Sequence, residues 1–266
     1  MKIKTIPMIT LLVFFIFTLF SIVTACDECV LSKAATYTSA SSLSSGACGY
    51  GSLALKLNGG HVASGVPSLY NNGAGCGACY QIRCKNNAMC TKSGIKVVMT
   101  DINKNNKTDF VLSSRAFKAM ALPGKDLQVL KLGSLDVEYK RVPCDYKGQN
   151  MGIRVEESSK NPDYLAIQIL YQGGQTDIVA IDVAKVGSSN WRFMTRKYGA
   201  VWETQRAVSG ALQFRFVITS GFDGKTIWAK NVIPQNWRTG VIYDTKLQIH
   251  DIALHGCNPC PQLLWN

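Results

Sequence analysis

The clearest alternation of apolar and polar positions lies between residues 212 and 219. Apolar side chains at Leu212, Phe214, Phe216 and Ile218 alternate with Gln213, Arg215, Val217 and Thr219, which indicates a strand with one buried face. Asp223-Gly224 follows at the place where a tight hairpin would turn. The same reasoning predicts further strands at Met151–Glu157, Tyr164–Tyr171, Asp177–Val183, Thr226–Val232 and Leu247–Ile252. Several short strands separated by turn residues predict a β-sandwich.

The amino-terminal half predicts short strands joined by wide loops. Ile95–Asp101 is rich in β-branched residues, and Asp136–Val142 alternates. One helix is expected, capped by Ser113 or Ser114 and ended by Pro123-Gly124. Two segments rich in Gly, Ser and Asn predict long loops that disulfides hold or that line a site: Thr38–Gly51 and Asn58–Gly77.

The first 25 residues have the three parts of a secretory signal peptide. Lys2 and Lys4 precede an apolar run from Ile6 to Val23, and Val23-Thr24-Ala25 offers small residues to a signal peptidase. The alternative is a membrane anchor, because a spanning helix needs roughly 18 apolar residues. No basic stop-transfer cluster follows, so we expect cleavage after Ala25 and no membrane association afterwards. In a bacterial source, Cys26 would also suit lipidation.

The ten cysteines all follow this leader. An oxidising compartment preserves disulfides, so we expect disulfides rather than free thiols. Three Cys-x-x-Cys pairs also have the spacing of zinc ligands, at 26/29, 76/79 and 257/260, but export favours bridges here as well. The three histidines, His61, His250 and His255, are scattered. We therefore expect neither a metal site nor a cofactor.

The chain is basic, with a formal charge of +12 that becomes +10 once Lys2 and Lys4 are removed. This charge indicates a general attraction to a polyanionic matrix. Nucleic acid is not expected as a partner, because the chain is exported and has no long Lys/Arg run.

The spacing of the cysteines indicates two domains. Six lie between Cys48 and Cys144, and none lies between Cys144 and Cys257. We expect a disulfide-bonded domain over residues 26–145, a second domain over 146–254 that its own core holds together, and a cysteine-containing tail over 255–266. The polar, glycine-containing segment Asp145–Asn150 is the expected linker.

Several short motifs together resemble the plant expansin superfamily. They are Ala47-Cys-Gly-Tyr-Gly51, Gly75-Cys-Gly-Ala-Cys-Tyr80, Val98-Met-Thr-Asp101 and Val142-Pro-Cys144. The tail His255-Gly-Cys-Asn-Pro-Cys260 resembles the expansin-like A branch. The resemblance covers essentially the whole mature chain. It implies a mainly β protein, a double-psi β-barrel related to family 45 glycoside hydrolases followed by an immunoglobulin-like β-sandwich that binds polysaccharide.

The resemblance also implies a disulfide pairing for the six central cysteines. Six cysteines permit 15 connectivities, so spacing alone does not choose among them. The family pattern pairs Cys48 with Cys76, Cys79 with Cys144, and Cys84 with Cys90.

The position of the family's general acid is occupied by a residue that cannot transfer a proton. Inverting glycoside hydrolysis needs two carboxyl groups, one as acid and one as base. Expansins keep an aspartate in a His-Phe-Asp-Leu-Ser segment, and Val111 stands at its position in Asp109-Phe110-Val111-Leu112-Ser113. Asp109 could replace it only from roughly 6–7 Å along the strand, a large displacement for catalysis. We therefore expect no catalytic residue.

The candidate polysaccharide-binding residues lie in both domains. In the barrel they are Asp101, which either binds sugar hydroxyls or caps the loop Ile102–Lys107, and Thr36 with Tyr37, after which Thr38 stands where the family has a second aromatic residue. In the sandwich, Tyr164, Trp191 and Tyr198 resemble the family's aromatic platform. Three other tryptophans are expected to be structural: Trp202, Trp228 and Trp237.

These features predict a secreted, monomeric, non-hydrolytic protein of the plant cell wall that binds cellulose or associated glucans. Asn106-Lys107-Thr108 is a glycosylation sequon. Modulation of wall extensibility is a further hypothesis, against which Val111 argues, because it replaces a residue that wall loosening in the family is thought to need. Two rival functions remain, a weak glycosidase that uses Asp101 and Asp109, and an apoplastic ligand or signalling partner without affinity for polymers.

The two terminal cysteine pairs generate the first testable prediction. We expect Cys26 or Cys29 to bond to Cys257 or Cys260, so that the two ends of the mature chain are joined. Non-reducing peptide mapping of the secreted protein should recover a peptide that contains both ends. Recovery of only local Cys26–Cys29 and Cys257–Cys260 bonds would refute this pairing.

Overall fold

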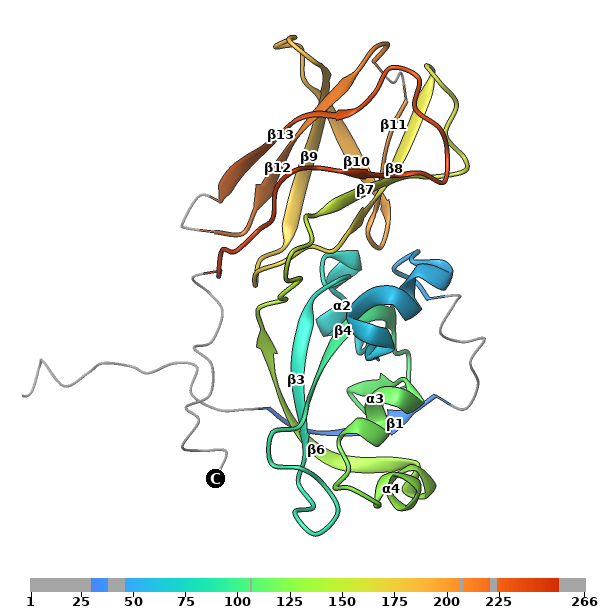
Figure 1. The fold of residues 1–266 in the computed structure, drawn as a ribbon, viewed down its shortest axis with the longest axis vertical. Helices are drawn as coiled ribbons and strands as arrows, with labels where there is room; N and C mark the ends of the chain where they lie inside the picture. The colour runs from blue at the N-terminus through green and yellow to red at the C-terminus, as the bar shows by residue number, and fades with distance from the viewer. Residues whose placement is uncertain (1–29, 38–45, 106, 206–207, 221–223, 254–266) are drawn as a thin grey trace, which may run out of the picture.

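The protein is built from two β-domains that follow one another along its long axis (Figure 1). The structure is a computed structural model, and it describes residues 30–37, 46–105, 107–205, 208–220 and 224–253. The first domain is a closed six-stranded barrel, and the second is an eight-stranded sheet folded over as a sandwich. The fold class expected from the sequence is confirmed. Within the described ranges, no helix is long and apolar enough to cross a membrane.

The barrel closes in the strand order β1-β5-β2-β4-β3-β6. The pairs β1/β5 and β2/β4 are parallel, and the other neighbours are antiparallel. Its interior is filled by alternate side chains of every strand and by an edge-to-face aromatic group of Tyr80, Phe110 and Tyr139. The strands are β1 (Val30–Thr36), β2 (Val62–Gly65), β3 (Cys79–Cys84), β4 (Ile95–Ile102), β5 (Phe110–Leu112) and β6 (Ser134–Val142).

Short helices cover the barrel. They are a 3-10 segment at Gly51–Gly60, α2 (Pro67–Tyr70), a 3-10 turn at Asn71–Gly73, α3 (Ser114–Ala119) and α4 (Asp126–Leu132). The predicted long loop at residues 58–77 therefore contains β2 and α2, and α4 was not predicted. Ser113 caps α3 by accepting a hydrogen bond from the Ala116 amide. The helix ends at Ala119, before Pro123, because the Leu122 amide donates to the Met89 carbonyl instead of to the Lys118 carbonyl.

The sandwich strands follow the order β13-β12-β9-β10-β11-β8-β7-β14. The first half of β10 pairs with β9 and its second half pairs with β11, with a bulge between Arg196 and Tyr198. This strand therefore joins the two layers of the sandwich. The strands are β7 (Gly152–Val155), β8 (Tyr164–Leu170), β9 (Ile178–Lys185), β10 (Arg192–Tyr198), β11 (Val201–Gln205), β12 (Leu212–Ile218), β13 (Lys225–Ile233) and β14 (Ile242–Asp244).

The alternation read from the sequence is confirmed in β12. Phe214 and Phe216 are fully buried in the sandwich core, and β12 pairs with β13 as an antiparallel hairpin. Trp202 and Trp237 also belong to this core. The expectation that Trp228 is structural is wrong, because half of its surface is exposed (50%) on the outer face of β13.

The predicted strand at 247–252 is wrong, although Ile249 is buried there. The segment forms an isolated bridge between Ile252 and Gln175 rather than a strand ladder, and Gln248, next to Ile249, bonds through its side chain. The Gln248 amide oxygen accepts from the Gly173 and Ile249 amides, and its nitrogen donates to the Tyr171 carbonyl. Strands β10, β11 and β14 were not predicted, because their residues mix apolar and charged side chains without a clear period.

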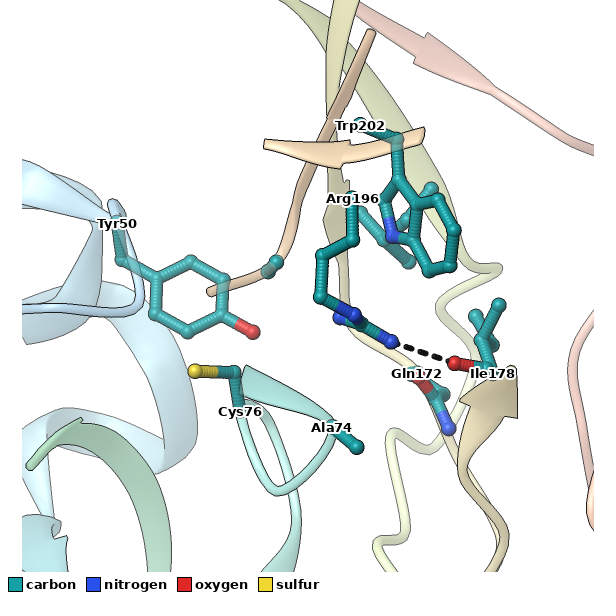
Figure 2. A pocket seen from close by; sticks show the side chains of 9 residues that line it. Tyr50, Ala74, Cys76, Gln172, Ile178, Arg196 and Trp202 are labelled. Atoms are coloured by element: carbon teal, nitrogen blue, oxygen red, sulfur yellow. Dashed lines mark hydrogen bonds between the residues drawn. The ribbon is translucent and has the colours of Figure 1, made fainter. Parts of the chain in front are cut away.

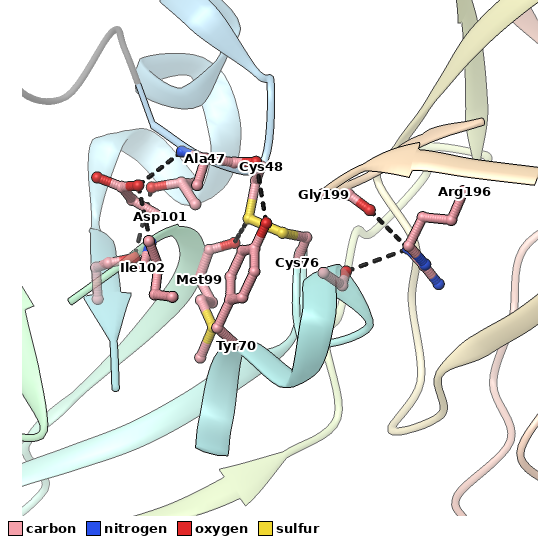
Figure 3. The surroundings of a disulfide bond; sticks show 12 residues. Ala47, Cys48, Tyr70, Cys76, Met99, Asp101, Ile102, Arg196 and Gly199 are labelled. Atoms are coloured by element: carbon pink, nitrogen blue, oxygen red, sulfur yellow. Dashed lines mark hydrogen bonds between the residues drawn. A yellow bond between two sulfur atoms is a disulfide. The ribbon is translucent and has the colours of Figure 1, made fainter. Parts of the chain in front are cut away.

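The three central disulfides are those that the family resemblance implies: Cys48–Cys76, Cys79–Cys144 and Cys84–Cys90. The first two lie in an apolar cluster that includes Leu170 and Ala200 of the sandwich. The cluster therefore belongs to both domains, and burying it holds them together. Figure 3 shows Cys48–Cys76 between the barrel and the turn at Gly199.

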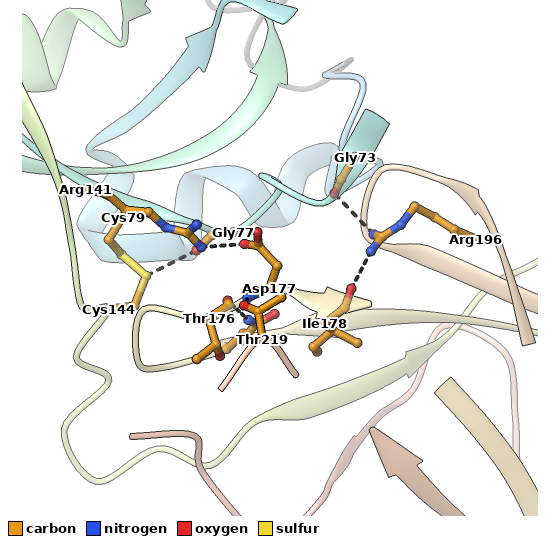
Figure 4. A network of polar contacts seen from close by, with 11 residues as sticks. Gly73, Gly77, Cys79, Arg141, Cys144, Thr176, Asp177, Ile178, Arg196 and Thr219 are labelled. Carbon is orange, nitrogen blue, oxygen red and sulfur yellow. Dashed lines mark hydrogen bonds and ion pairs between the residues drawn. A yellow bond between two sulfur atoms is a disulfide. The ribbon is translucent and has the colours of Figure 1, made fainter. Parts of the chain in front are cut away.

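Two arginines add hydrogen bonds at this interface (Figure 4). The Arg196 guanidinium donates to the carbonyls of Gly73 in the barrel (3.2 Å) and Gly199 in the sandwich (2.6 Å). Arg141 of β6 pairs with Asp177 of the sandwich at 2.5 Å. The Ala200 amide donates to the Cys48 carbonyl at 3.1 Å. Because the interface is tied at several points, it has little freedom to open as a hinge.

A small cavity remains between the domains beside Arg196 (Figure 2). Tyr50 and Cys76 line it from the barrel, and Trp202 lines it from the sandwich. Its volume of about 10 Å³ is close to the space that one water molecule needs. It is too small for a sugar.

Gly199 provides a test of this close contact. A β-carbon there would lie 2.5 Å from the Cys48 Cα and 2.6 Å from the Ala47 carbonyl oxygen. Gly199→Ala should therefore cost about 1–3 kcal/mol through overpacking, in addition to about 1–2 kcal/mol for a left-handed alanine. Thermal unfolding should show a midpoint several degrees below that of the control.

The matched control is Gly187→Ala. Gly187 also has a positive φ, of +80°, but no atom lies within 4 Å of its β-carbon position. An equal loss of stability in both variants would contradict the close packing of the domains at Gly199.

Candidate polysaccharide-binding surface

Asp101 lies at the end of β4, where it holds the loop that leads to Cys48 (Figure 3). Its Oδ1 accepts hydrogen bonds from the backbone amides of Ala47 (2.6 Å) and Ile102 (2.8 Å). Its Oδ2 lies 3.4 Å from the Tyr37 hydroxyl, which donates to it. Asp101 therefore fixes backbone more than 50 residues away, and one oxygen faces the candidate site.

Tyr37 follows β1, and Asp101 and burial together control its hydroxyl. The pKa of Tyr37 is raised to about 12. Burial of the hydroxyl is the largest cause of this rise, and the negative charge of Asp101 adds to it. The hydroxyl therefore stays protonated and can donate hydrogen bonds at neutral pH. The neighbouring Thr36 Oγ1 is buried and has no hydrogen-bond partner among the described residues. The structure places this oxygen away from the surface.

Val111 lies in one cross-strand row with Asp101. The register pairs Val111 of β5 with Ser64 of β2, and Ser64 with Asp101 of β4. Adjacent strands are about 4.8 Å apart, so this row places the valine about 10 Å from Asp101. Asp109 lies two residues away from Val111, and its Oδ2 accepts a hydrogen bond from Tyr139 of β6 at 3.4 Å. The two carboxylates thus have different partners.

A continuous series of contacts leads from this end of the barrel to the sandwich. The Tyr70 hydroxyl of α2 donates to the Ala47 carbonyl at 3.3 Å. Two residues further on, a β-carbon at Gly49 would lie 2.7 Å from the Tyr198 ring, so the tyrosine packs on the glycine backbone. Tyr198 itself is 44% exposed. The Asp101 loop and the exposed ring of Tyr198 therefore adjoin each other.

Tyr164 shares the outer face of β8, β10 and β11 with Tyr198, and Lys197, the neighbour of Tyr198 in sequence, connects it to a network. Its hydroxyl donates to Glu203 Oε2 at 2.5 Å and accepts from Lys197 Nζ at 2.8 Å. Lys197 also pairs with Glu203 at 3.1 Å. Hydrogen bonds to Tyr164 and Glu203 raise the pKa of Lys197, and the bond from Tyr164 lowers the pKa of Glu203. The network fixes the Tyr164 ring.

The structure does not bring Trp191 to this pair of tyrosines. Trp191 packs edge-on against Trp228 of β13, with the ring centroids 5.2 Å apart. The Arg215 guanidinium of β12 lies 4.8 Å from the centre of the Trp191 ring. Trp191 therefore belongs to the other layer of the sandwich. The predicted three-residue platform is reduced to Tyr164 and Tyr198.

Several site residues were not anticipated from the sequence. Ser64, Tyr70, Lys197 and Glu203 contact the site through tertiary pairing, and no local pattern marks them. Other predicted residues lie outside the described ranges: Asn106, Cys26, Cys29, Cys257 and Cys260. In the described ranges, no three His, Cys, Asp or Glu side chains gather closely enough to hold a metal ion.

Comparison with known proteins identifies both domains. A family model described as the expansin C-terminal domain matches residues 151–234, and one described as lytic transglycolase matches residues 62–139. A barrel joined in this way to a sandwich defines an expansin, and the chain belongs to that family.

Its relatives assign the branch. Expansin-like A1 of Arabidopsis thaliana is 58% identical over 96% of this chain and 98% of its own length. Expansin-like A3 of rice, Oryza sativa subsp. japonica, is 53% identical over 79% of this chain and 76% of its own length. The protein is a member of the expansin-like A group.

Solved structures share the fold at low identity. The apo expansin of Clavibacter michiganensis aligns with a TM-score of 0.64 at 19% identity, over 83% of this chain and 98% of its own. A mutant of that expansin, solved in complex with cellohexaose, aligns with a TM-score of 0.63 at 18% identity, over 82% of this chain and 98% of its own. The two-domain architecture is therefore common to bacterial and plant proteins.

The environment of Tyr37 predicts how stability responds to alkaline pH. Tyr37 loses its proton near pH 10 in the unfolded chain and near pH 12 in the folded one, so its contribution is complete below pH 10 and disappears between these values. Tyr37→Phe should therefore reduce the loss of stability between pH 10 and 12, measured by denaturant unfolding at fixed pH.

Asp101→Asn should lower the pKa of Tyr37. Ultraviolet difference titration measures this pKa, with the Tyr37→Phe variant as the reference. An unchanged titration would contradict the Asp101 contact.

Proposed function

We propose that this protein is secreted to the plant cell wall as a monomer and binds cellulose or associated glucans without hydrolysing them. The observation that carries the proposal is the series of contacts from Tyr37 and Asp101 to Tyr198 and Tyr164. These residues place hydrogen-bond donors, hydrogen-bond acceptors and aromatic rings along one surface that spans both domains. Membership of the expansin family and the cellohexaose complex of a bacterial expansin with the same fold support it.

Aromatic faces suit a glucan because the C–H groups of a pyranose pack on a ring while its hydroxyls reach polar neighbours. Tyr198 supplies an exposed ring, and the network with Glu203 and Lys197 fixes Tyr164 on the same face. Rings that are already fixed lose little conformational freedom when a ligand binds. The polymer therefore meets a surface that is ready to bind.

The charge of this face favours an uncharged polymer. Arg154 and Lys197 contribute two positive charges, and Glu156, Glu157 and Glu203 contribute three negative ones. This ion-paired cluster beside the tyrosines therefore carries a net charge of −1 on a chain whose total is +12. A neutral glucan suits it better than a uronate polymer does, because like charges repel.

Three features argue against hydrolysis. Val111 cannot transfer a proton, Asp101 is occupied with two backbone amides, and Asp109 is bonded to Tyr139. An inverting mechanism needs one carboxyl as acid and another as base across the sugar. We propose that neither aspartate takes the general-acid role. Binding without cleavage is then the activity that the site supports.

The test is a pull-down of the secreted protein on insoluble cellulose and hemicellulose. An aromatic contact contributes about 0.5–1.5 kcal/mol, so Tyr164→Ala/Tyr198→Ala should weaken binding at this surface by roughly 5- to 100-fold. Tyr164→Phe/Tyr198→Phe keeps both rings and should retain most of the affinity. Leu127→Ala, at an exposed residue of α4 on the barrel, is the control for unspecific surface effects.

Two results would overturn the proposal. Failure of the unmodified protein to bind any wall polymer would leave the apoplastic ligand or signalling partner as the better account. Release of reducing sugar from wall glucans that Asp101→Asn abolishes would instead identify a glycosidase.

A further inference from the structure

The sandwich has a second outer face, formed by β10, β9, β12 and β13, in the other layer from Tyr164. The strand register places four side chains in one row across this face: Phe193, Asp182, Arg215 and Trp228. Their neighbours in sequence, such as Met194, Phe214 and Ala229, point into the core. In Figure 1, β13 and β12 lie towards the left of the upper domain, and β8 and β11 lie towards the right.

Large aromatic side chains are exposed at both ends of this row. Phe193 is 60% exposed and Trp228 is 50% exposed. Trp191 supports Trp228 from the side, with their rings at 77°. The Arg215 guanidinium lies 4.8 Å from the Trp191 ring centre and 5.8 Å from that of Trp228. These contacts hold the tryptophan in place although half of it faces solvent.

The middle of the row offers hydrogen bonds. Arg215 Nε donates to Asp182 Oδ2 at 2.7 Å, and this pair leaves no net charge. Within the described part of the chain, the two terminal nitrogens of Arg215 and the second oxygen of Asp182 have no hydrogen-bond partner. The Arg215 side chain is 33% exposed and that of Asp182 is 14% exposed, so the guanidinium is the main polar group that the row presents between the two exposed aromatic rings.

We propose that this face is a second polysaccharide-binding site, and that it takes an uncharged wall glycan. Sugar C–H groups would pack on Trp228 and Phe193, and sugar hydroxyls would bond to Arg215 and Asp182. The neutral ion pair offers no surplus charge to attract a uronate polymer. Polar side chains divide the apolar ones, unlike the apolar centre of most protein interfaces. The row crosses three strand intervals, about 14 Å, so it accommodates a length of chain rather than a single sugar.

The site extends the proposed function but uses none of its residues. Tyr198 and Trp228 lie on different layers with the sandwich core between them. One molecule can therefore hold two glycan chains at once, one on each face. Such a protein would link polymers as well as adhere to one.

The test measures stoichiometry as well as affinity. Titration calorimetry of the complete secreted protein with cellohexaose and with soluble xyloglucan should find two sites for at least one of these probes. Phe193→Ala/Trp228→Ala should remove one site, and Tyr164→Ala/Tyr198→Ala should remove the other. The remaining site should keep its affinity within roughly threefold, because distant sites behave independently. Arg215→Lys keeps the positive charge but loses the planar group, and it should weaken only the second site.

The outcomes separate the two proposals. Loss of all binding in the tyrosine variant, with no effect of Phe193→Ala/Trp228→Ala, would overturn the second site and leave the proposed function standing. Loss of one site only in the Phe193/Trp228 variant would support the second site, whatever the tyrosine variant does. Stronger binding of polygalacturonate than of both neutral probes at this face would overturn the assignment of an uncharged glycan. Absence of binding to both neutral probes by the unmodified protein would overturn the second site. The thermal midpoint of each variant controls for folding.

Discussion

The buried cluster between the domains is the constraint on which the rest of this structure depends. The Cys48–Cys76 disulfide fixes the segment that contains Gly49, on which Tyr198 packs. Leu170 and Ala200 of the sandwich lie in the same apolar cluster as this disulfide. A disulfide removes conformational freedom from the unfolded chain, and the apolar contact adds burial in the folded one. Because the cluster contains residues of both domains, it positions the barrel surface against the sandwich surface.

Asp101 orders one end of the barrel. Its carboxylate accepts two backbone hydrogen bonds, which order the loop before Cys48. Hydrogen bonds to a charged acceptor are stronger than those between neutral groups, so this loop is held firmly. Val111 lies in the same cross-strand row, on the strand beyond Ser64, and its side chain has no group that transfers a proton. Asp101 therefore orders the loop before Cys48 and accepts a hydrogen bond from the Tyr37 hydroxyl.

The two outer faces of the sandwich have different chemistry. The ion-paired side chains beside Tyr164 and Tyr198 have a net charge of −1. On the other face, Arg215 and Asp182 neutralise each other.

The sequence alone determined much of the fold, through the alternation of apolar and polar residues and through short motifs. The alternation at Phe214 and Phe216 predicted a strand and its buried face, since a strand has only two faces. Short motifs identified the family and, through it, the barrel, the sandwich and the central disulfides. The tertiary structure decided which residues lie together on each surface. Trp191 and Tyr198 are seven residues apart, but β10 passes from one layer to the other between them, so they cannot share a platform. The partner of Asp101 lies 54 residues away, and only the closed barrel brings it near. Sequence specifies which side of a strand is apolar, but the packing of distant strands decides which exposed residues become neighbours.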